Sequence, residues 1–272
     1  MARPEARPGD HLSWLFSSDD ELIEAATTYL ADGLDRGERL LYVADRPTDD
    51  ALLGDLAGLG DVGRLVADGT LSVQRSRALY APGEVLDGPR QVATYRRMTE
   101  DALAAGFTGF RVAADATALV TDPDWRRDFL AYELAVDRYI ASSAMVALCA
   151  YDERILGTDA LDLACVHPGR HVREEADPGF HVCAAEVGFT LAGELDHANR
   201  DLFRRAVDAA VRSGGRAGLA VDVGSLAFVD AAALAVLARE AEVVGPIRLH
   251  NADARIGRLV DLLGFDRLLV RS

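Results

Sequence analysis

The chain has 272 residues, of which 50% are hydrophobic and 27% are charged. This composition is typical of folded proteins, and the length is enough for two modest hydrophobic cores. The formal net charge of −15 repels phosphate backbones and anionic lipids, so the sequence disfavours nucleic acids and membranes as partners. Apart from His, every basic residue is Arg, which excludes a P-loop and Schiff-base chemistry because both need Lys.

The three cysteines, Cys149, Cys165 and Cys183, are far apart and form no CxxC pair. Their odd number and spacing indicate neither a disulfide framework nor a zinc ribbon, and they favour buried thiols in a reducing compartment. The N-terminal segment has no apolar h-region, and no apolar run in the sequence approaches the roughly 20 residues that span a bilayer. We therefore expect a cytoplasmic protein.

Between residues 9 and 171, short apolar runs alternate with amphipathic helical patterns, which is typical of an α/β sheet. We expect a strand at residues 11–16 and then a helix that Ser18 and Glu21 open as a capping box. Further strands are predicted at residues 39–44, 71–73, 110–114 and 144–150, and further helices at 48–58, 90–105 and 123–140. Strands joined by helical crossovers predict a mostly parallel sheet with helices on both faces.

Residues 172–179 are predicted to form a linker, because Pro-Gly pairs flank a charged stretch without apolar periodicity. A second domain then covers residues 180–272. Its strands are predicted at residues 180–184, 187–192, 217–223 and 247–250, and its helices at 198–212, 231–243 and 253–263. The fold class predicted for the whole chain is therefore α/β, in two domains.

Two motifs in the second domain, Gly193-Glu-Leu-Asp196 and residues 222–234, resemble the STAS domain of bacterial anti-sigma factor antagonists. In that family a partner kinase phosphorylates a hydroxyl residue two places after the Asp that corresponds to Asp230. That place is Ala232, which has no oxygen to phosphorylate. The resemblance implies a small mixed sheet with helices on one side. It also implies that the loops of Asp196 and Asp230 lie side by side and bind a histidine-kinase-like anti-sigma factor.

Both of these Asp residues precede predicted helices, so each carboxylate is expected to cap free backbone N–H groups. Two interpretations of these residues are open. They serve only as helix caps, or they cap the helices and the surface around them also binds a protein. For the second case we predict that the partner contacts Asp196, His197, Asp230, Ala231, Ala232 and Ala233. Ser225 is expected to be an ordinary turn residue.

The first domain resembles the MEDS family of sensory domains through short motifs spread over its length. They are His11 before an aromatic strand, residues 30–34 and 37–45, Gly109-Phe-Arg-Val112, Tyr132-Glu133, Cys149-Ala-Tyr-Asp152 and His167-Pro168. The resemblance implies a RecA/KaiC-like fold that is distantly related to ATPases. The chain has no GxxxxGK[ST] loop, however, and residues 16–20 would present acid to an anion, so ATP hydrolysis of the P-loop kind is not expected.

Ligands of open α/β sheets usually bind beyond the carboxyl ends of the strands. On that basis we predict that a ligand site in the first domain includes His11, Trp14, Asp45, Asp115, Tyr151 and Asp152. Each of them could equally be an ordinary core or edge residue. His11, Cys149 and His167 could hold a metal ion, but ligands so far apart in the sequence give no spacing signal. We therefore predict no metal site, no cofactor and no catalytic residues.

Together these patterns predict a signalling protein in which a sensory domain controls a STAS domain that lacks the phosphoacceptor. Expected partners are an anti-sigma factor or other STAS proteins, with a possible small-molecule ligand at the first domain and a possible homodimer. The alternative is a nucleotide-binding or enzymatic module derived from ATPases, in which the STAS domain serves only dimerisation. A third hypothesis is a lipid-transport accessory protein, although such STAS proteins usually lack an input domain. The Arg-rich and Ala-rich composition and the resemblance favour an actinobacterial host.

Overall fold

The computed structural model describes residues 6–79, 86–167, 177–185, 187–214 and 219–271. The chain divides into two compact units, one built around each of two five-stranded sheets. Most of the predicted linker, at residues 172–176, lies outside the described residues. None of the helices in the described ranges is long and apolar enough to cross a lipid bilayer.

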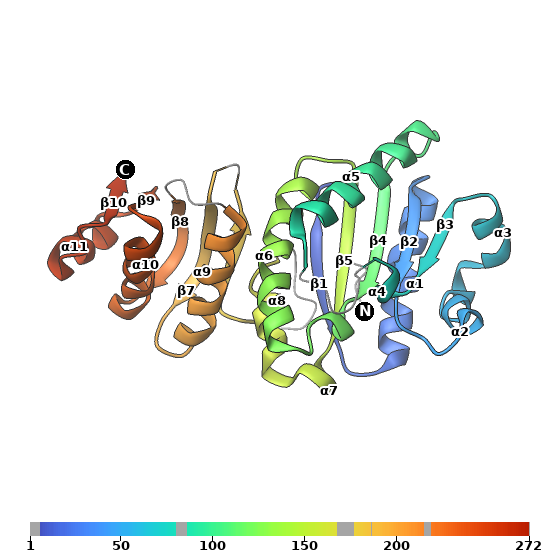
Figure 1. Ribbon diagram of the computed structural model, residues 1–272, viewed down its shortest axis with the longest axis horizontal. Helices are drawn as coiled ribbons and strands as arrows, with labels where there is room; N and C mark the ends of the chain where they lie inside the picture. Colours follow the sequence, from blue (N-terminus) through green and yellow to red (C-terminus); the bar gives the residue numbers. More distant parts are fainter. Residues whose placement is uncertain (1–5, 80–85, 168–176, 186, 215–218, 272) are drawn as a thin grey trace. The chain divides into compact units, whose positions relative to one another are not determined.

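The sheet of the first unit has five parallel strands in the order β1-β5-β4-β2-β3 (Figure 1). The strands are β1 (His11–Phe16), β2 (Arg39–Val43), β3 (Leu71–Gln74), β4 (Phe110–Asp115) and β5 (Met145–Asp152). The predicted parallel α/β sheet is confirmed, because each predicted strand is present.

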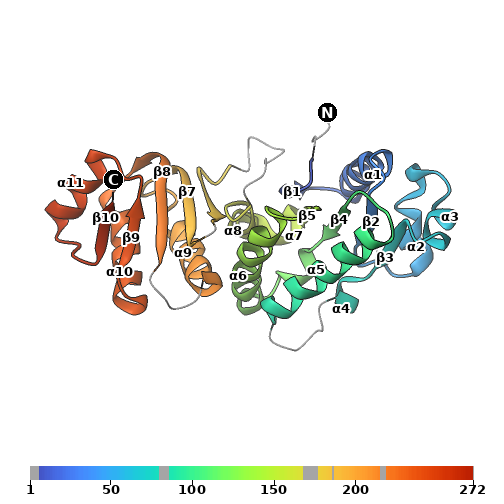
Figure 2. The same ribbon diagram turned by 90° about the horizontal axis from the view of Figure 1, so that it is seen from above.

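Helices connect these strands, and Figure 2 shows α1 on one face of the sheet and α5 on the other. The helices are α1 (Asp19–Asp35), α2 (Asp49–Gly54), α3 (Val62–Ala67), α4 (Ser76–Leu79), α5 (Gly88–Ala104), α6 (Pro123–Ile140), α7 (Glu153–Leu156) and α8 (Ala160–Ala164). The three long helices α1, α5 and α6 match the predicted ones. The short helices α3, α4, α7 and α8 were not predicted, because so few residues do not display an amphipathic period.

The start of α1 confirms one half of the predicted capping box. The hydroxyl of Ser18 accepts a hydrogen bond from the backbone N–H of Glu21 at 3.2 Å. The other half is wrong, since the Glu21 carboxylate accepts from the backbone N–H and the hydroxyl of Ser17, each at 3.0 Å, instead of from Ser18. The Glu21 carboxylate still adds a negative charge at the N-terminus of α1, where the helix dipole favours it.

Side chains of the first sheet point alternately to its two faces. On one face, Leu12 and Trp14 of β1 and Leu148 of β5 belong to the buried core that includes α1 residues. His11 precedes Leu12, and Cys149 follows Leu148, so the side chains of both point to the opposite face. This alternation decides which of the predicted ligand-binding residues can line one site.

The sheet of the second unit has the strand order β10-β9-β8-β7-β6. The strands are β6 (Phe180–Ala184), β7 (Phe189–Leu195), β8 (Ala220–Val229), β9 (Ile247–His250) and β10 (Leu268–Arg271). β6 and β7 are antiparallel and the other neighbours are parallel, which confirms a mixed sheet. β10 was not predicted from the sequence.

The helices of the second unit are α9 (Arg200–Gly214), α10 (Ala231–Val244) and α11 (Ala254–Leu263). Figure 2 shows α9 and α10 side by side on one side of the sheet, as predicted. Part of the core between sheet and helix is an edge-to-face pair of Phe180 and Phe203, whose ring centroids are 5.5 Å apart. Such aromatic pairs bury much apolar area and favour this geometry.

The prediction for β8 is wrong in one respect. A turn was expected after Val223, but the strand continues through Gly224 and Ser225 to Val229. Ser225 is therefore a strand residue that lies opposite Ala192 of β7. The register between β7 and β8 shifts twice along this pairing, so β8 contains two bulges and uses two more residues than β7 over the same length.

Candidate functional site

Two of the predicted ligand-binding residues meet at the carboxyl edge of the first sheet. Asp115 ends β4 and Asp152 ends the neighbouring strand β5. Thr117 links them, because its backbone N–H donates to Oδ1 of Asp115 at 3.1 Å and its hydroxyl accepts from the backbone N–H of Asp152 at 2.9 Å. Burial raises the pKa of Asp115 above the ordinary Asp value.

A second polar group at this edge follows β2. Arg46 donates from Nε to Oδ2 of Asp55 at 2.7 Å, and the hydroxyl of Tyr42 donates to the same oxygen at 2.9 Å. Burial, and then the negative charge of Asp55, raise the pKa of Tyr42 well above its ordinary value. Tyr42 is therefore a neutral hydrogen-bond donor at physiological pH.

The carboxylate of Asp152 lies close to a cation. Arg154 donates to both of its oxygens, and the same guanidinium reaches Asp19 at 2.7 Å. The hydrogen bond from Arg154 holds the pKa of Asp152 below the ordinary value. The carboxyl edge of the first sheet is therefore acidic, and its cations are already paired with carboxylates.

The remaining predicted ligand residues are not brought together. Asp45 follows β2 and is partly exposed, whereas His11 is the first residue of β1 and lies at the opposite, amino end of the sheet. Trp14 points to the face that carries α1, and Tyr151 points to the other face, as Cys149 does. The prediction that His11 and Trp14 approach one cavity is therefore wrong, because residues three positions apart in a strand point to opposite faces of the sheet.

His11 instead contacts Cys149 of the neighbouring strand β5. Its Nε2 lies 3.6 Å from Sγ of Cys149. Both residues were considered, with His167, as metal ligands from the sequence, and the expectation of no metal site stays a prediction.

In the second unit, the ends of β7 and β8 bring the two motif aspartates together. Leu195 pairs with Val229 in register, and the backbone N–H of Asp230 donates to the carbonyl oxygen of Leu195 at 3.0 Å. Asp196 and Asp230 are therefore next to each other at the same edge of the sheet. Asp230 caps α10 as predicted, because its Oδ1 accepts from the backbone N–H of Ala233 at 2.7 Å.

The predicted cap by Asp196 is wrong. Its Oδ1 accepts from the backbone N–H of Ala198 at 2.7 Å, which closes a turn, while α9 begins only at Arg200. Asn199 stabilises this turn through its side chain, which accepts from the N–H of Asp196 and donates to the carbonyl oxygen of Glu194. The short turn places the Asp196 carboxylate ahead of the helix.

The other predicted contact residues differ in their exposure. His197 and Ala231 are exposed, and Ala232 is partly exposed, so their side chains can touch a partner. Ala233 is 1% exposed, and it belongs to the core of α10. The prediction that Ala233 contacts a partner through its side chain is therefore wrong.

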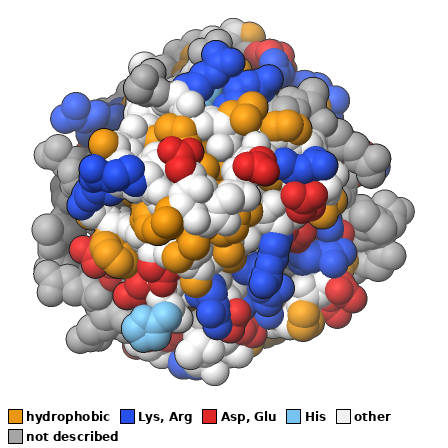
Figure 3. All heavy atoms as spheres, turned by 90° about the vertical axis from the view of Figure 1, so that its left-hand side faces the viewer, with side chains coloured by type: hydrophobic (Ala, Val, Ile, Leu, Met, Phe, Trp, Pro, Cys, Tyr) orange, Lys and Arg blue, Asp and Glu red, His pale blue; other side chains and the backbone are white. Residues whose placement is uncertain are grey.

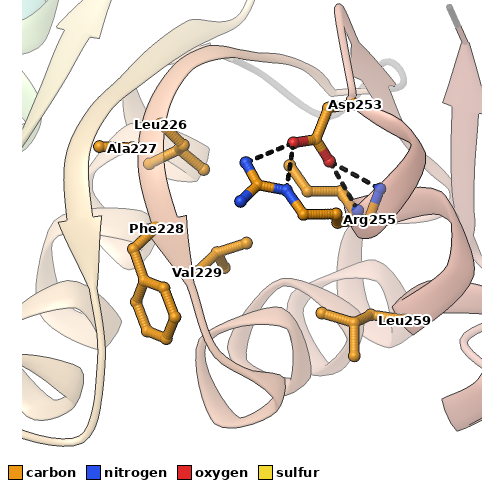
Figure 4. Close-up of a pocket in the computed structure, with 8 residues that line it drawn as sticks. Leu226, Ala227, Phe228, Val229, Asp253, Arg255 and Leu259 are labelled. Carbon is orange, nitrogen blue, oxygen red and sulfur yellow. Dashed lines mark hydrogen bonds and ion pairs between the residues drawn. The ribbon is translucent and has the colours of Figure 1, made fainter.

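A pocket of about 160 Å³ lies between the carboxyl half of β8 and α11 (Figure 4). Its lining residues are Leu226, Ala227, Phe228, Val229, Asp253, Arg255, Ile256 and Leu259. The only charged side chains in this lining, Asp253 and Arg255, are paired with each other at 2.8 Å. The lining is otherwise apolar. Asp230 directly follows the lining residue Val229 in the sequence.

The end of the second unit that contains α11 and β10 also exposes apolar side chains. Figure 3 shows hydrophobic groups gathered in the middle of this face, with Arg, Asp and Glu around them. Exposed apolar residues on these two elements are Leu262, Leu263, Leu269 and Val270. Clusters of this kind on a folded domain are typical of protein-binding surfaces.

Comparison with known families shows to which domain family each part of the chain is related. The family model described as the methanogen/methylotroph DcmR sensory domain, MEDS, matches residues 10–168, which is more than half of the chain. The chain belongs to the MEDS family. A second model, described as the Mlab STAS domain, matches residues 184–271. No curated protein matches the sequence.

The MEDS domain thus contains the acidic carboxyl edge and the contact between His11 and Cys149, and the STAS domain contains the Asp196 and Asp230 loops. Sequence reasoning missed Asp55 and Thr117 at the MEDS edge. Asp55 lies within a predicted helix and Thr117 in a loop, and neither has a motif around it. Only the folded arrangement brings them to Tyr42 and Asp115.

The raised pKa of Asp115 makes a testable prediction for the MEDS domain. A carboxyl group whose pKa is higher in the folded state stabilises the fold when protonated, and this contribution is lost as pH rises from about 4 through the folded-state pKa. We therefore expect Asp115→Asn to increase stability at pH 7 relative to wild type, and to have less effect at pH 4. Urea unfolding can be followed by Trp fluorescence, because both Trp residues, Trp14 and Trp125, belong to the MEDS domain. An equal shift of the urea midpoint at the two pH values would contradict the prediction.

Proposed function

We propose that this protein is a cytoplasmic signalling protein without enzymatic activity. In this proposal the MEDS domain receives a chemical input, and the STAS domain regulates sigma-factor activity by binding an anti-sigma factor or other STAS proteins. The observation that carries the proposal is the juxtaposition of Asp196 and Asp230 at the ends of β7 and β8. Two carboxylates that flank an exposed helix start form an acidic contact surface for a protein partner.

The side chain of Ala232 supports regulation by binding instead of by phosphate transfer. A phosphate at this helix start would add negative charge and bulk between Asp196 and Asp230, and would repel a docked partner. Ala232 has no acceptor oxygen, so this switch is absent at this position. The proposal therefore assigns the control of partner binding to the MEDS domain.

Apolar surface next to the two loops supports a protein as the ligand. Phe228 is 49% exposed although it is a large hydrophobic side chain, and it lines the pocket beside α11. Aromatic side chains that are surrounded by a polar rim are typical of the centres of protein interfaces. The proposed contact surface therefore combines an exposed apolar side chain, Phe228, with the carboxylates of Asp196 and Asp230.

The proposal is tested with a charge placed on the contact surface. We expect Ala231→Arg to remove binding of the partner, because Ala231 is exposed at the first position of α10 and the Arg would place bulk and a positive charge beside the two carboxylates. Wild-type and variant proteins are used as baits in host lysate, and the bound proteins are quantified by mass spectrometry. The expected result is a histidine-kinase-like anti-sigma factor or other STAS proteins on the wild-type bait, reduced at least about tenfold on the variant.

The matched control is Val243→Arg, which makes a similar substitution near the other end of the same helix. Val243 is 80% exposed, so Arg is accommodated there without loss of packing. This control is expected to retain the partners of the wild-type bait. Equal retention of these partners by Ala231→Arg, or their absence from the wild-type bait, would remove the basis for the assignment.

The alternative function is a nucleotide-binding module in which the STAS domain serves only dimerisation. The described carboxyl edge of the MEDS sheet gives it little support, because Asp19, Asp115 and Asp152 would oppose a polyphosphate. Nucleotide binding raises the melting temperature of the protein that binds it. A concentration-dependent rise with ATP or GTP would favour the alternative over the sensory function.

A further inference from the structure

We propose that the groove between the carboxyl half of β8 and α11 binds an extended peptide segment of a partner protein. The segment adds to the STAS sheet as a strand, and it carries basic residues around one apolar residue. The groove is the pocket of about 160 Å³ described above, and all of its lining residues belong to the STAS domain.

The edge of β8 that faces β9 is paired over only part of its length. β9 pairs with Ala220, Val221 and Asp222, and within residues 219–271, all of which the structure describes, no other strand pairs with this edge. On the opposite edge, β7 continues to pair with β8 as far as Val229. Beyond Asp222, the backbone of β8 therefore offers N–H and C=O groups to which no strand is paired.

The direction of these groups can be followed at Val229. The backbone N–H of the next residue, Asp230, donates to the carbonyl oxygen of Leu195 in β7. Successive residues of a strand direct their backbone groups to opposite neighbours, so the N–H and C=O of Val229 point away from β7. Val229 also lines the pocket. The unpaired backbone groups and the pocket are therefore on the same edge of β8.

The lining of the pocket shows that it runs along this edge. Four consecutive residues of β8 line it, from Leu226 to Val229. Side chains of a strand alternate between the two faces of a sheet, so four in succession border one space only along the edge of the strand. Figure 4 shows these residues on one side of the space, and Arg255 and Leu259 of α11 on the other.

The groove exists because the chain leaves the sheet directly after β9. Asn251 has a φ of +56°, a conformation that Asn tolerates better than most residues, and its Nδ2 donates to Oδ2 of Asp222 at 2.8 Å. The carboxylate of Asp253 then caps α11 by accepting from the backbone N–H of Ile256 at 2.9 Å. The position beside β8 that β9 would occupy if it were longer is therefore left to a ligand.

The groove has room for one apolar side chain. Its volume of about 160 Å³ is similar to that of an engineered protein cavity of about 150 Å³ that holds benzene. A strand that pairs with the edge of β8 would place alternate side chains on one face of the sheet, and one of them would enter this space. In peptide recognition by strand addition, backbone hydrogen bonds supply affinity and such pockets supply specificity. A helical ligand could not form these bonds, because its backbone groups are paired internally.

Carboxylates beyond both ends of the groove determine the charge of the ligand. Asp222 precedes the open edge of β8, and Asp230 follows it with Asp196 alongside. Among the lining residues the only cation, Arg255, is neutralised by Asp253 at 2.8 Å. Charge complementarity therefore favours a segment with Arg or Lys on either side of its apolar residue.

The first experiment selects ligands from a phage-displayed library of random heptapeptides on the full-length protein. Seven residues are long enough, because Gly224–Val229 of β8 spans about 20 Å. We expect the selected peptides to share an apolar residue flanked by Arg or Lys. Ala227→Trp should weaken their binding at least about tenfold, because the indole would fill the pocket. The matched control is Val243→Trp, which adds the same side chain at a position that is 80% exposed and should leave binding unchanged.

The second experiment uses wild-type protein and keeps the proposal falsifiable if Ala227→Trp fails to fold. A selected peptide is synthesised in two N-methylated forms, one modified at odd positions and one at even positions. Only one form lacks the N–H groups that face β8, so one should bind at least about tenfold more weakly and the other with little change. The unmodified peptide should also slow hydrogen exchange of the β8 amides between Ser225 and Val229.

Three results would each overturn the proposal. They are a library that yields no peptide of this pattern, equal effects of the two N-methylated forms, and unchanged exchange of the β8 amides in the presence of a bound peptide. These measurements use isolated peptides. They therefore succeed or fail separately from the capture of an anti-sigma factor, which tests the proposed function.

Discussion

Replacing Arg111 with Ala is expected to destabilise the MEDS domain by about 3–5 kcal/mol, because the substitution leaves a buried carboxylate without its partner. Arg111 is fully buried, and its guanidinium contacts Glu38, which is 2% exposed. The same guanidinium reaches Asp32 at 3.1 Å and the carbonyl oxygens of Tyr29 and Ala6 at 3.3 and 3.2 Å. The loss is measured by urea unfolding followed by Trp fluorescence.

A double variant separates the loss of the ion pair from the loss of volume. When both members of a buried pair are replaced by apolar residues of similar size, stability is often unchanged or increased. We expect Arg111→Met with Glu38→Leu to recover much of the stability that Arg111→Ala loses. A loss below about 1 kcal/mol in Arg111→Ala would show that water or another cation compensates Glu38.

Replacing Gly193 with Ala is expected to destabilise the STAS domain by about 3 kcal/mol or more, from backbone strain together with a steric clash. Gly193 has a φ of +95°, and a Cβ atom there would lie 2.4 Å from the carbonyl oxygen of Gly179 and 2.9 Å from Cα of Phe180. Phe180 pairs with Gly193 across β6 and β7. An added methyl group therefore has to push the two strands apart.

Gly245→Ala is the matched control for this prediction. Gly245 has nearly the same φ, +92°, but no atom lies within 4 Å of the Cβ position. Its substitution should cost about 1–3 kcal/mol, from conformation alone. Hydrogen exchange of the β6 and β7 amides, together with urea unfolding followed by circular dichroism, would measure both variants. Equal losses at the two positions would show that the clash is relieved without cost.

The motif that contains Gly193 has two separate roles. In Gly193-Glu-Leu-Asp196, the glycine is needed for the close approach of β6, whereas Asp196 is partly exposed at the sheet edge. One motif therefore combines a residue required by the fold with a residue available to a partner. The STAS fold could be predicted from it, but the partner could not.

Much of the architecture could be predicted because local pattern and folded structure agree. The strand His11–Phe16 and the helix Pro123–Ile140 have the predicted bounds, since turn residues and amphipathic periods mark their ends. At Gly224 and Ser225 the local pattern indicated a turn, but both lie in β8, where Ser225 pairs with Ala192 of β7. Tertiary hydrogen bonding overrode local propensity there.

The candidate sites were less predictable than the fold. His11, Trp14 and Tyr151 were grouped because ligands of open α/β sheets usually bind beyond the carboxyl ends of the strands, but alternation sends Trp14 to the face opposite the other two. The contact between His11 and Cys149 depends on the pairing of β1 with β5 in the fold, and the spacing of residues along a sequence carries no information about that.

The two bulges of β8 determine how the two loop carboxylates of the STAS domain line up. Without the two extra residues, Leu195 would lie opposite Ala227 instead of Val229, and Asp230 would project past the end of β7 by about 7 Å. Removing one residue between Asp222 and Asp230 would also turn every later side chain of β8 to the other face. The number of residues between Asp222 and Asp230 therefore fixes where Asp230 lies relative to Asp196. An insertion or deletion there would misalign the acidic surface although every side chain of that surface is still present.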